Sequence, residues 1–253
     1  MSNILDYPRL VFVLSFIVLW GAALFGSFMR KKLGPLDEAE RDVFGFVQTA
    51  ILTLLGLIIG FTFSMALGRY DQRKNYEEAE ANAIGTEYIR ADLLPTAKAR
   101  ELRELLKCYL DQRILFYTTR DLAQLQQIDI RTTKLQDDLW SVVEAGAAAQ
   151  PTATIALAVS GMNDVLNSQG YTQAAWWYRI PAQAWVLMTA IAIWCNLLLG
   201  YGARRSGKLL FVVVPLAVAI SFFLISDIDS PRRGMVSIRP LNLISLSQVL
   251  HAQ

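Results

Sequence analysis

The decisive stretch of this sequence reads FGFVQTAILTLLGLIIGFTFSMALG from Phe44 to Gly68 and continues as RYDQRKNYEEAEANAIGTEYIRADLL from Arg69 to Leu94. The first part contains no charged residue and is long enough to span a hydrocarbon core of ~30 Å as a helix. The second part is polar, but it keeps helix-favouring Ala, Glu and Leu and repeats apolar residues three or four positions apart. No proline interrupts the stretch before Pro95. It is therefore predicted to form one long helix, half in lipid and half in water.

Other blocks of the sequence are as apolar as this one. Apolar residues make up 54% of the 253-residue chain. They gather into four uncharged segments, which are Leu10–Met29, Val43–Gly68, Ile180–Ala203 and Leu209–Ser226. Each segment has about the length that a membrane-spanning helix needs. We therefore expect an all-α polytopic membrane protein with four transmembrane helices.

The polar part between the second and third spans is too long and too regular for a loop. Its segments 96–120, 121–149 and 151–166 place apolar residues at helical spacing, with charged residues on the opposite face. Gly170 is expected to end the last of these helices, and strand patterns are absent from the sequence. The predicted organisation is a transmembrane pair at 1–68, a helical bundle at 69–180, a second transmembrane pair at 181–228 and a polar C-terminal tail at 229–253.

The second span carries small side chains at four-residue intervals. These are Gly56, Gly60, Ser64 and Gly68. Such a stripe lies on one helix face and lets another membrane helix approach closely. Three interpretations are open: packing within the chain, packing between subunits, and a surface that faces a pore. Phe61 and Phe63 lie near the same end of the span, where their rings either form a constriction that gates by dewetting or face lipid.

Mixed charges follow the second and fourth spans. They are Arg69, Asp71 and Arg73 after the second span, and Asp227, Asp229, Arg232 and Arg233 after the fourth. Four spans place both clusters on the same side of the membrane, and we expect Asp71 and Arg73 to pair with the second cluster. Two roles fit these residues: an ion-pair belt that fixes the spans to the helical bundle, or a charged vestibule.

Basic residues in the short connections indicate the orientation, because Lys and Arg are favoured in cytoplasmic loops. In the two tight connections they are Arg30, Lys31, Lys32 and Arg41, and Arg204, Arg205 and Lys208. These connections are therefore predicted to be cytoplasmic. The helical bundle and both termini are then extracytoplasmic.

The sequence lacks the usual groups for catalysis. Its single histidine, His251, lies in the C-terminal tail, and CxxC, HExxH, P-loop and GxGxxG motifs are absent. Glu77, Glu78 and Glu80 form an acidic cluster without the alternating oxygen ligands of a calcium loop. A net charge of +2 gives no basic field for nucleic acid. We therefore expect no enzyme, no metal or cofactor and no nucleic-acid partner.

Three specific stretches carry a resemblance that covers nearly the whole chain. They are GFTFSMALGRYDQR (Gly60–Arg73), EAEANAIGTEYIRADLLP (Glu78–Pro95) and ISDIDSPRRG (Ile225–Gly234). These stretches resemble a bacterial family of four-span membrane proteins that is called bestrophin-like. The resemblance implies a multi-pass protein of the bacterial inner membrane with the layout of bestrophins, which are pentameric anion channels whose second span lines the pore. Bestrophins keep their helical domain in the cytoplasm, opposite to the orientation that the basic connections predict.

Two functions from different classes fit these observations. The first is a homo-oligomeric ion channel in the lipid bilayer that conducts inorganic ions, and the resemblance implies a pentamer. It is suggested by the small-residue stripe, the charged exits of the spans and the bestrophin-like layout. The second is a membrane-anchored sensor or scaffold whose helical domain binds a partner or an envelope component. A transporter is a further interpretation.

Overall fold

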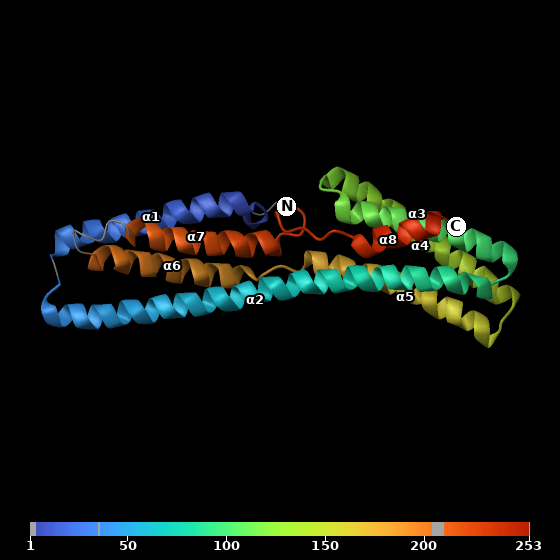
Figure 1. Ribbon diagram of the computed structural model, residues 1–253, viewed down its shortest axis with the longest axis horizontal. Helices are drawn as coiled ribbons and strands as arrows, with labels where there is room; N and C mark the ends of the chain where they lie inside the picture. Colours follow the sequence, from blue (N-terminus) through green and yellow to red (C-terminus); the bar gives the residue numbers. More distant parts are fainter. Residues whose placement is uncertain (1–3, 35, 204–209, 253) are drawn as a thin grey trace. The chain divides into compact units, whose positions relative to one another are not determined.

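A computed structural model describes residues 4–34, 36–203 and 210–252, and within these ranges the chain is helical and contains no strand (Figure 1). The predicted all-α fold is confirmed. The α-helices are α1 (Pro8–Leu33), α2 (Glu38–Arg90), α3 (Thr96–Thr118), α4 (Leu122–Ala149), α5 (Ala153–Trp177), α6 (Ala182–Gly202), α7 (Leu210–Asp229) and α8 (Leu241–His251). Short 3₁₀ turns are η1 (Ile4–Asp6) and η2 (Ala91–Leu93). The basic connection at Arg204, Arg205 and Lys208 lies outside the described residues.

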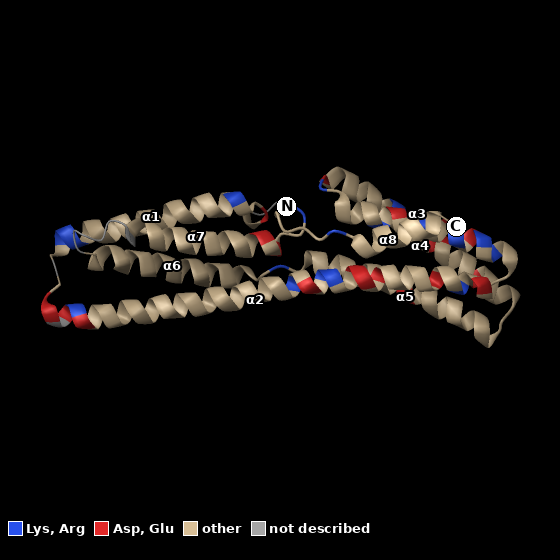
Figure 2. Cartoon of the chain, in the orientation of Figure 1, with Lys and Arg blue, Asp and Glu red and all other residues tan. Residues whose placement is uncertain are grey.

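Four helical segments are long and apolar enough to cross a membrane, in agreement with the four predicted spans. They lie within Pro8–Leu33, Glu40–Leu93, Ala153–Gly202 and Phe211–Asp229. The central turns of α1, α6 and α7 carry no charged side chain (Figure 2). A helix bonds its own backbone groups internally, which a segment in hydrocarbon requires. The chain therefore has the character of a polytopic membrane protein.

The chain divides into two compact units, and α2 contributes to both. The first unit comprises Met1–Tyr70 and Arg179–Ser237, and the second comprises Asp71–Tyr178 and Ile238–Gln253. With 53 residues, α2 is much longer than a membrane span requires. The first unit contains the helices whose central turns are uncharged, and the second contains the polar helices.

The core of the first unit lies between α1, α6 and α7, each of which contacts the other two. Leu19, Met188 and Phe222 are buried there, one from each helix. One face of α2 adds Leu55 and Ala66 to the same core. In lipid this contact depends on close packing, because lipid tails are as apolar as the side chains that the core removes from them.

Two glycines make a close crossing of α1 and α6. A Cβ added at Gly26 would lie 2.1 Å from the carbonyl oxygen of Leu197, and one added at Gly200 would lie 1.9 Å from that of Ala23. No side chain fits at either position, so the two backbones are in direct contact. Small residues at the interface of membrane helices permit such an approach. The crossing thus depends on the absence of two methyl groups.

The second unit is a bundle formed by α3, α4, α5, α8 and the polar half of α2. Its buried core includes Ile84, Leu106, Tyr109, Leu139 and Met162. The segment expected to be a polar C-terminal tail includes α8, which contacts α3. The last helix of the chain thereby belongs to this bundle.

The fifth helix is longer than the sequence predicted. Gly170 does not end it, because α5 continues to Trp177. A glycine inside a helix costs only about 1 kcal/mol relative to alanine. Beyond it, Thr172 and Trp176 are buried, and the Trp176 ring packs edge-on against Phe116 with centroids 5.1 Å apart. This packing outweighs the local cost of glycine.

Gly26→Ala is predicted to destabilise the first unit, because the added methyl group meets backbone that cannot turn aside. Overpacking of this kind typically costs about 1–3 kcal/mol. Thermal unfolding of the purified protein in detergent measures the effect. Gly21→Ala is the matched control in the same helix, since an added Cβ there meets nothing within 4 Å. Equal melting temperatures for the two variants would show that the crossing is not tight.

Candidate functional site

The candidate pore or packing stripe lies on the face of α2 that points away from the core of the first unit. A Cβ added at Gly56, Gly60 or Gly68 would meet no atom of the described residues within 4 Å. Ser64 is also exposed, whereas Leu55 on the opposite face is buried. The stripe therefore makes no close helix contact within the described part of a single chain. The close packing of small residues is found at the crossing of α1 and α6 instead.

Large aromatic side chains accompany the stripe on the exposed side of α2. Phe46 is 77% exposed, Phe61 is 66% exposed and Phe63 is 38% exposed. Phe61 follows Gly60 by one position and so lies about 100° around the helix from it. Exposed rings on a span contact either lipid or another protein chain. The outer surface of α2 thus combines small residues with bulky rings.

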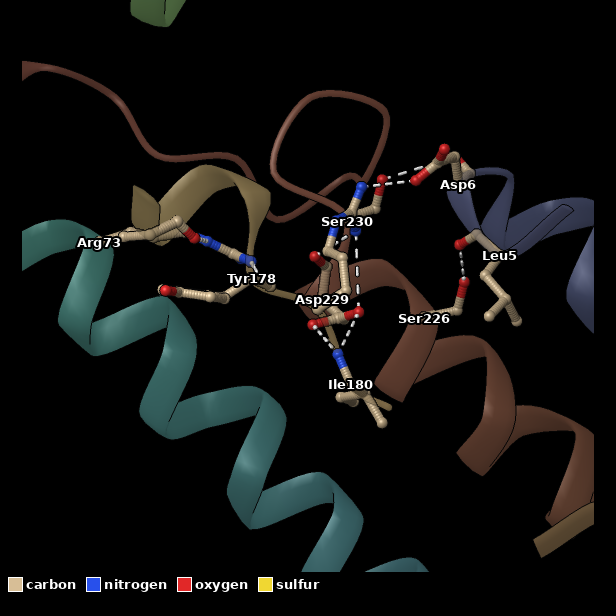
Figure 3. A network of polar contacts seen from close by, with 10 residues as sticks. Leu5, Asp6, Arg73, Tyr178, Ile180, Ser226, Asp229 and Ser230 are labelled. Carbon is tan, nitrogen blue, oxygen red and sulfur yellow. Dashed lines mark hydrogen bonds and ion pairs between the residues drawn. The ribbon is translucent and has the colours of Figure 1, made fainter. Parts of the chain in front are cut away.

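Asp229 fastens the exit of α7 to the start of the third span (Figure 3). Both of its carboxylate oxygens lie 3.3 Å from the backbone nitrogen of Ile180, which donates to them. One oxygen also lies 3.7 Å from the guanidinium of Arg179. Arg179 in turn donates to the Asp6 carboxylate. These contacts connect the N-terminal turn, the segment before α6 and the end of α7.

Asp227 organises the loop that follows α7. Its carboxylate accepts hydrogen bonds from the two backbone N–H groups of residues 235–236, at 2.6 and 2.9 Å. Arg233 places its guanidinium over the ring of Tyr7, 4.3 Å from the centroid. Arg232 lies half-buried in the same loop. Both aspartates of the predicted cluster thus hold backbone groups in place.

Arg73 caps the end of α5. It is 1% exposed, and it donates through Nε to the carbonyl of Ala175 and through Nη2 to that of Tyr178, each at 3.0 Å (Figure 3). The last carbonyls of a helix have no partner within it, and a cation suits the negative end of the helix dipole. Arg69 is half-buried and Asp71 is exposed. Pairing of these residues with the cluster after α7 stays a prediction.

A line of buried charges on the polar half of α2 was not predicted from the sequence. Its members are Arg73, Glu77, Glu80 and Glu87, none more than 3% exposed. Their spacing places them on the same helix face as the buried Ile84. The charges of an amphipathic helix normally lie on its solvent face. These four share a face with the apolar Ile84 instead, and this spacing was the signal in the sequence that they are buried.

Glu80 and Arg113 form an ion pair in the interior of the second unit, and both side chains are 0% exposed. Glu80 also accepts hydrogen bonds from the Tyr117 hydroxyl at 3.2 Å and from the Thr172 hydroxyl at 3.1 Å. Desolvation opposes the charge on Arg113, but the nearby carboxylate raises the pKa of Arg113 overall. Removing one partner of a buried pair typically costs about 3–5 kcal/mol. The pair therefore holds α2 to α3, and the bond from Thr172 adds α5.

Glu77 holds the first turn of α8. Its carboxylate accepts from the backbone N–H groups of Asn242 and Leu243, at 2.9 and 3.0 Å, and from the Asn242 side-chain amide at 2.6 Å. The first N–H groups of a helix lack partners within it, and the helix dipole favours an anion at this end. The acidic cluster noted in the sequence therefore includes a cap for a distant helix.

Glu87 is the buried charge without a compensating bond. It is 0% exposed, and neither carboxylate oxygen has a hydrogen-bond partner among the described residues. It lies against Gly161 of α5, where an added Cβ would be 2.1 Å from one of its oxygens. Desolvation raises the pKa of Glu87 to about 8, against the lowering effect of Arg90 and with a further rise from Asp164. Glu87 is therefore mostly protonated at neutral pH.

The described residues offer little for metal or covalent chemistry. Among them, His, Cys, Asp and Glu form no group of three or more that suits a metal ion. His251 lies on α8 with Nε2 3.4 Å from Asp111, and both side chains are exposed. The polar groups described above hold helix ends, loops and each other. The outer face of α2 has no such structural contact within the described part of the chain.

Comparison with known proteins connects this architecture to one family. The Bestrophin-like domain matches residues 12–243. A bacterial Bestrophin homolog from Klebsiella pneumoniae, solved by Zn-SAD phasing, aligns with a TM-score of 0.65 and 14% identity over 96% of this chain and 96% of that chain. A mutant of a Klebsiella pneumoniae Bestrophin homolog aligns with a TM-score of 0.64 and 14% identity, covering 97% and 98%. No curated protein matches. At these identities the structural likeness shows a shared fold alone.

Glu87→Gln is predicted to stabilise the protein increasingly as pH rises. The folded state keeps a proton on Glu87 up to about pH 8, whereas the unfolded chain releases it near pH ~4.3. The contribution of Glu87 to stability is therefore complete below the unfolded pKa and is lost as pH rises through the folded pKa. Melting temperatures of variant and wild type between pH 5 and about pH 9 measure the difference.

The exposed neighbour Glu78 supplies the control for this series, since Glu78→Gln removes the same charge from the solvent face. It should give a difference from wild type that does not grow with pH. If Glu87→Gln shows the same flat profile, Glu87 is ionised in the folded protein.

Proposed function

Because the chain belongs to the Bestrophin-like family, we propose that it is a homo-oligomeric ion channel of the bacterial inner membrane in which α2 of each subunit faces a central axis. The observation that carries the proposal is the outer face of α2. Its small residues make no close contact within the described part of the chain. A stripe of this kind is suited to close contact with a helix of another subunit or to lining an ion pathway. The resemblance to bestrophins implies that the second span lines the pore.

Symmetry gives this face its function. Closed rings of identical subunits place the same surface of each around one axis. Gly56, Gly60 and Gly68 then leave room along the axis, and Ser64 adds a hydroxyl to the pathway. Phe63 lies beside the stripe, and a ring of its side chains forms an apolar constriction that gates by dewetting. Inorganic ions pass where the constriction is wetted.

The charged residues that follow the spans are candidates for the mouth of the proposed pore. Asp71 is exposed on α2 soon after the stripe ends at Gly68. Rings of charged side chains at the mouth of a pore raise or lower the local concentration of permeant ions. Asp227 and Asp229 fix the neighbouring loops through backbone bonds. Asp71 is therefore the more accessible charge for a vestibule.

A second candidate function is a membrane-anchored sensor or scaffold. A cavity of about 430 Å³ on the second unit supports it, between α4 and α5. Its polar lining includes Gln136, Asp137, Trp140, Glu144, Asn167 and Gln169. Carboxylates beside an indole ring suit a cationic ligand. In this alternative, the spans anchor the helical domain and conduct nothing.

We propose that the helical domain and both termini are extracytoplasmic, with the short basic connections in the cytoplasm. Arg30, Lys31, Lys32 and Arg41 flank the connection between α1 and α2. Lys and Arg in short loops near span ends are retained on the cytoplasmic side. The bestrophin layout favours the opposite arrangement, so the orientation requires its own test.

Gly60→Leu is predicted to reduce ionic current at least tenfold while leaving the subunit folded, because the added side chain enters the pathway and an added Cβ at this position meets no atom of the described residues within 4 Å. Purified protein in planar bilayers measures the current, and size-exclusion chromatography in detergent measures the oligomer. Gly21→Leu, at an equally open glycine of α1, should keep normal current. Normal current and assembly in Gly60→Leu would place the stripe against lipid. An oligomer with a lipid-filled axis would exclude the channel and favour the sensor.

A cysteine at Gln126 is predicted to react with a membrane-impermeant thiol reagent in intact spheroplasts. Gln126 is exposed on α4. The native Cys108 is also exposed, so the experiment uses a Cys108→Ser background, and the same background without the new cysteine is the control. Labelling only after lysis would place the helical domain in the cytoplasm.

A further inference from the structure

A cavity at the charged end of the first unit is lined by two arginines. Its volume is about 210 Å³, and it lies where the ends of α1 and α6 meet the start of α2. Its lining includes Arg30, Arg41, Phe44, Gln48, Tyr201 and Gly202. The cavity is separate from the stripe of small residues farther along α2.

The two arginines have no acidic partner among the residues that the structure describes. Both are half-buried, and no ion pair of the described residues includes Arg30 or Arg41. Two nearby acids in the chain are engaged elsewhere: Glu40 donates its backbone N–H to Asp37 at 2.7 Å, and Asp37 donates its own to Glu40 at 3.0 Å. Two positive charges beside one cavity repel each other, and an anion between them removes that repulsion.

The rest of the lining suits an oxyanion that carries a hydrophobic attachment. Tyr201 and Gln48 supply a hydroxyl and an amide that can donate. The rings of Phe44 and Tyr201 pack against each other with centroids 5.8 Å apart. A Cβ added at Gly202 would lie 2.6 Å from the Phe44 ring, so α6 closes tightly against α2 there. The cavity thus has a polar, cationic lining beside an aromatic wall.

The sequence places this cavity at the level of the lipid headgroups. The uncharged segment of α1 ends at Met29, immediately before Arg30, and that of α2 begins at Val43, shortly after Arg41. Arginine and aromatic side chains favour this boundary between hydrocarbon and water. Guanidinium groups bind phosphate through paired, charge-assisted hydrogen bonds.

We propose that this cavity binds a phosphate group, which Arg30 and Arg41 hold between α1 and α2. The phosphate is that of an anionic phospholipid headgroup or a free phosphate ion. A bound phosphate would connect α1 to α2, where Arg30 and Arg41 otherwise place two positive charges beside one cavity. The proposal is independent of whether the protein conducts ions.

The test compares melting temperatures of the purified protein in neutral detergent with three probes: dioleoyl phosphatidylglycerol, dioleoyl phosphatidylcholine and inorganic phosphate. Phosphatidylglycerol should raise the melting temperature more than phosphatidylcholine does. In the double variant Arg30→Gln/Arg41→Gln, the phosphatidylglycerol concentration for half the effect should rise at least tenfold. Stabilisation by millimolar inorganic phosphate alone would identify the free ion as a sufficient ligand. No stabilisation by inorganic phosphate, where phosphatidylglycerol stabilises, would identify the lipid headgroup as the ligand.

The double variant Lys31→Gln/Lys32→Gln is the matched control. It also removes two positive charges, both at the end of α1 beside Arg30, but the two lysines are exposed and do not line the cavity. Lipid binding should stay within a few-fold of wild type. An equal loss in both double variants, or no loss in either, would show that only the general surface charge attracts the lipid and would overturn the proposal.

Gly45→Leu tests the cavity without removing any charge. Gly45 lines it, and an added Cβ meets nothing within 4 Å, so the larger side chain should occupy the space of the ligand while the helix stays intact. The preference for phosphatidylglycerol should then disappear. If it persists with full strength in Gly45→Leu, the phosphate lies outside the cavity and the proposal fails, even where the arginine variant does not fold.

Discussion

A peptide group in hydrocarbon has no water with which to bond, and this constraint explains the form of the chain. Each apolar segment satisfies its backbone internally by forming a helix, so the spans are long and regular. Apolar burial does not hold such helices together in lipid. The contact energy comes from close packing, and the crossing at Gly26 and Gly200 supplies it through direct backbone contact. Three spans thereby form a core, and α2 packs on it with one face.

The second unit lies under a different constraint, because its helices end inside a folded bundle. Terminal N–H and C=O groups of a helix need partners, and charges on α2 supply them. Arg73 bonds to the carbonyls at the end of α5, and Glu77 bonds to the N–H groups at the start of α8. One helix therefore uses a single buried face to position two others.

The sequence predicted the parts of the structure that depend on local composition. The four uncharged segments predicted four spans. The amphipathic spacing of the segments between the second and third spans predicted the helices of the bundle. The prediction that Gly170 ends its helix was wrong, because the packing of Trp176 beyond it outweighs the low helix propensity of glycine. The spacing of Glu80 along α2 could have indicated that it is buried, but its partners could not be identified, since Arg113 and Thr172 lie 33 and 92 residues away. Long-range pairs of this kind have no signature in a single sequence.

The glycines show the same limit at the candidate site. Gly56 and Gly60 form a recognisable pattern, yet their face meets nothing in the described chain. Gly26 and Gly200 lack that pattern and make the close crossing. Which helix a small residue meets depends on a second segment far away in the sequence. The pattern identified a distinctive surface, and the structure determined which way it faces.

The contact between Glu77 and α8 has a consequence for the order of synthesis. Asn242 follows Glu77 by 165 residues, so the carboxylate is made long before the N–H groups that it accepts from. Two spans are produced in the interval. Domains generally fold as units during synthesis, but this bundle remains incomplete until α8 has been synthesised. A chain that stops before α8 therefore contains a buried carboxylate without the helix that it caps.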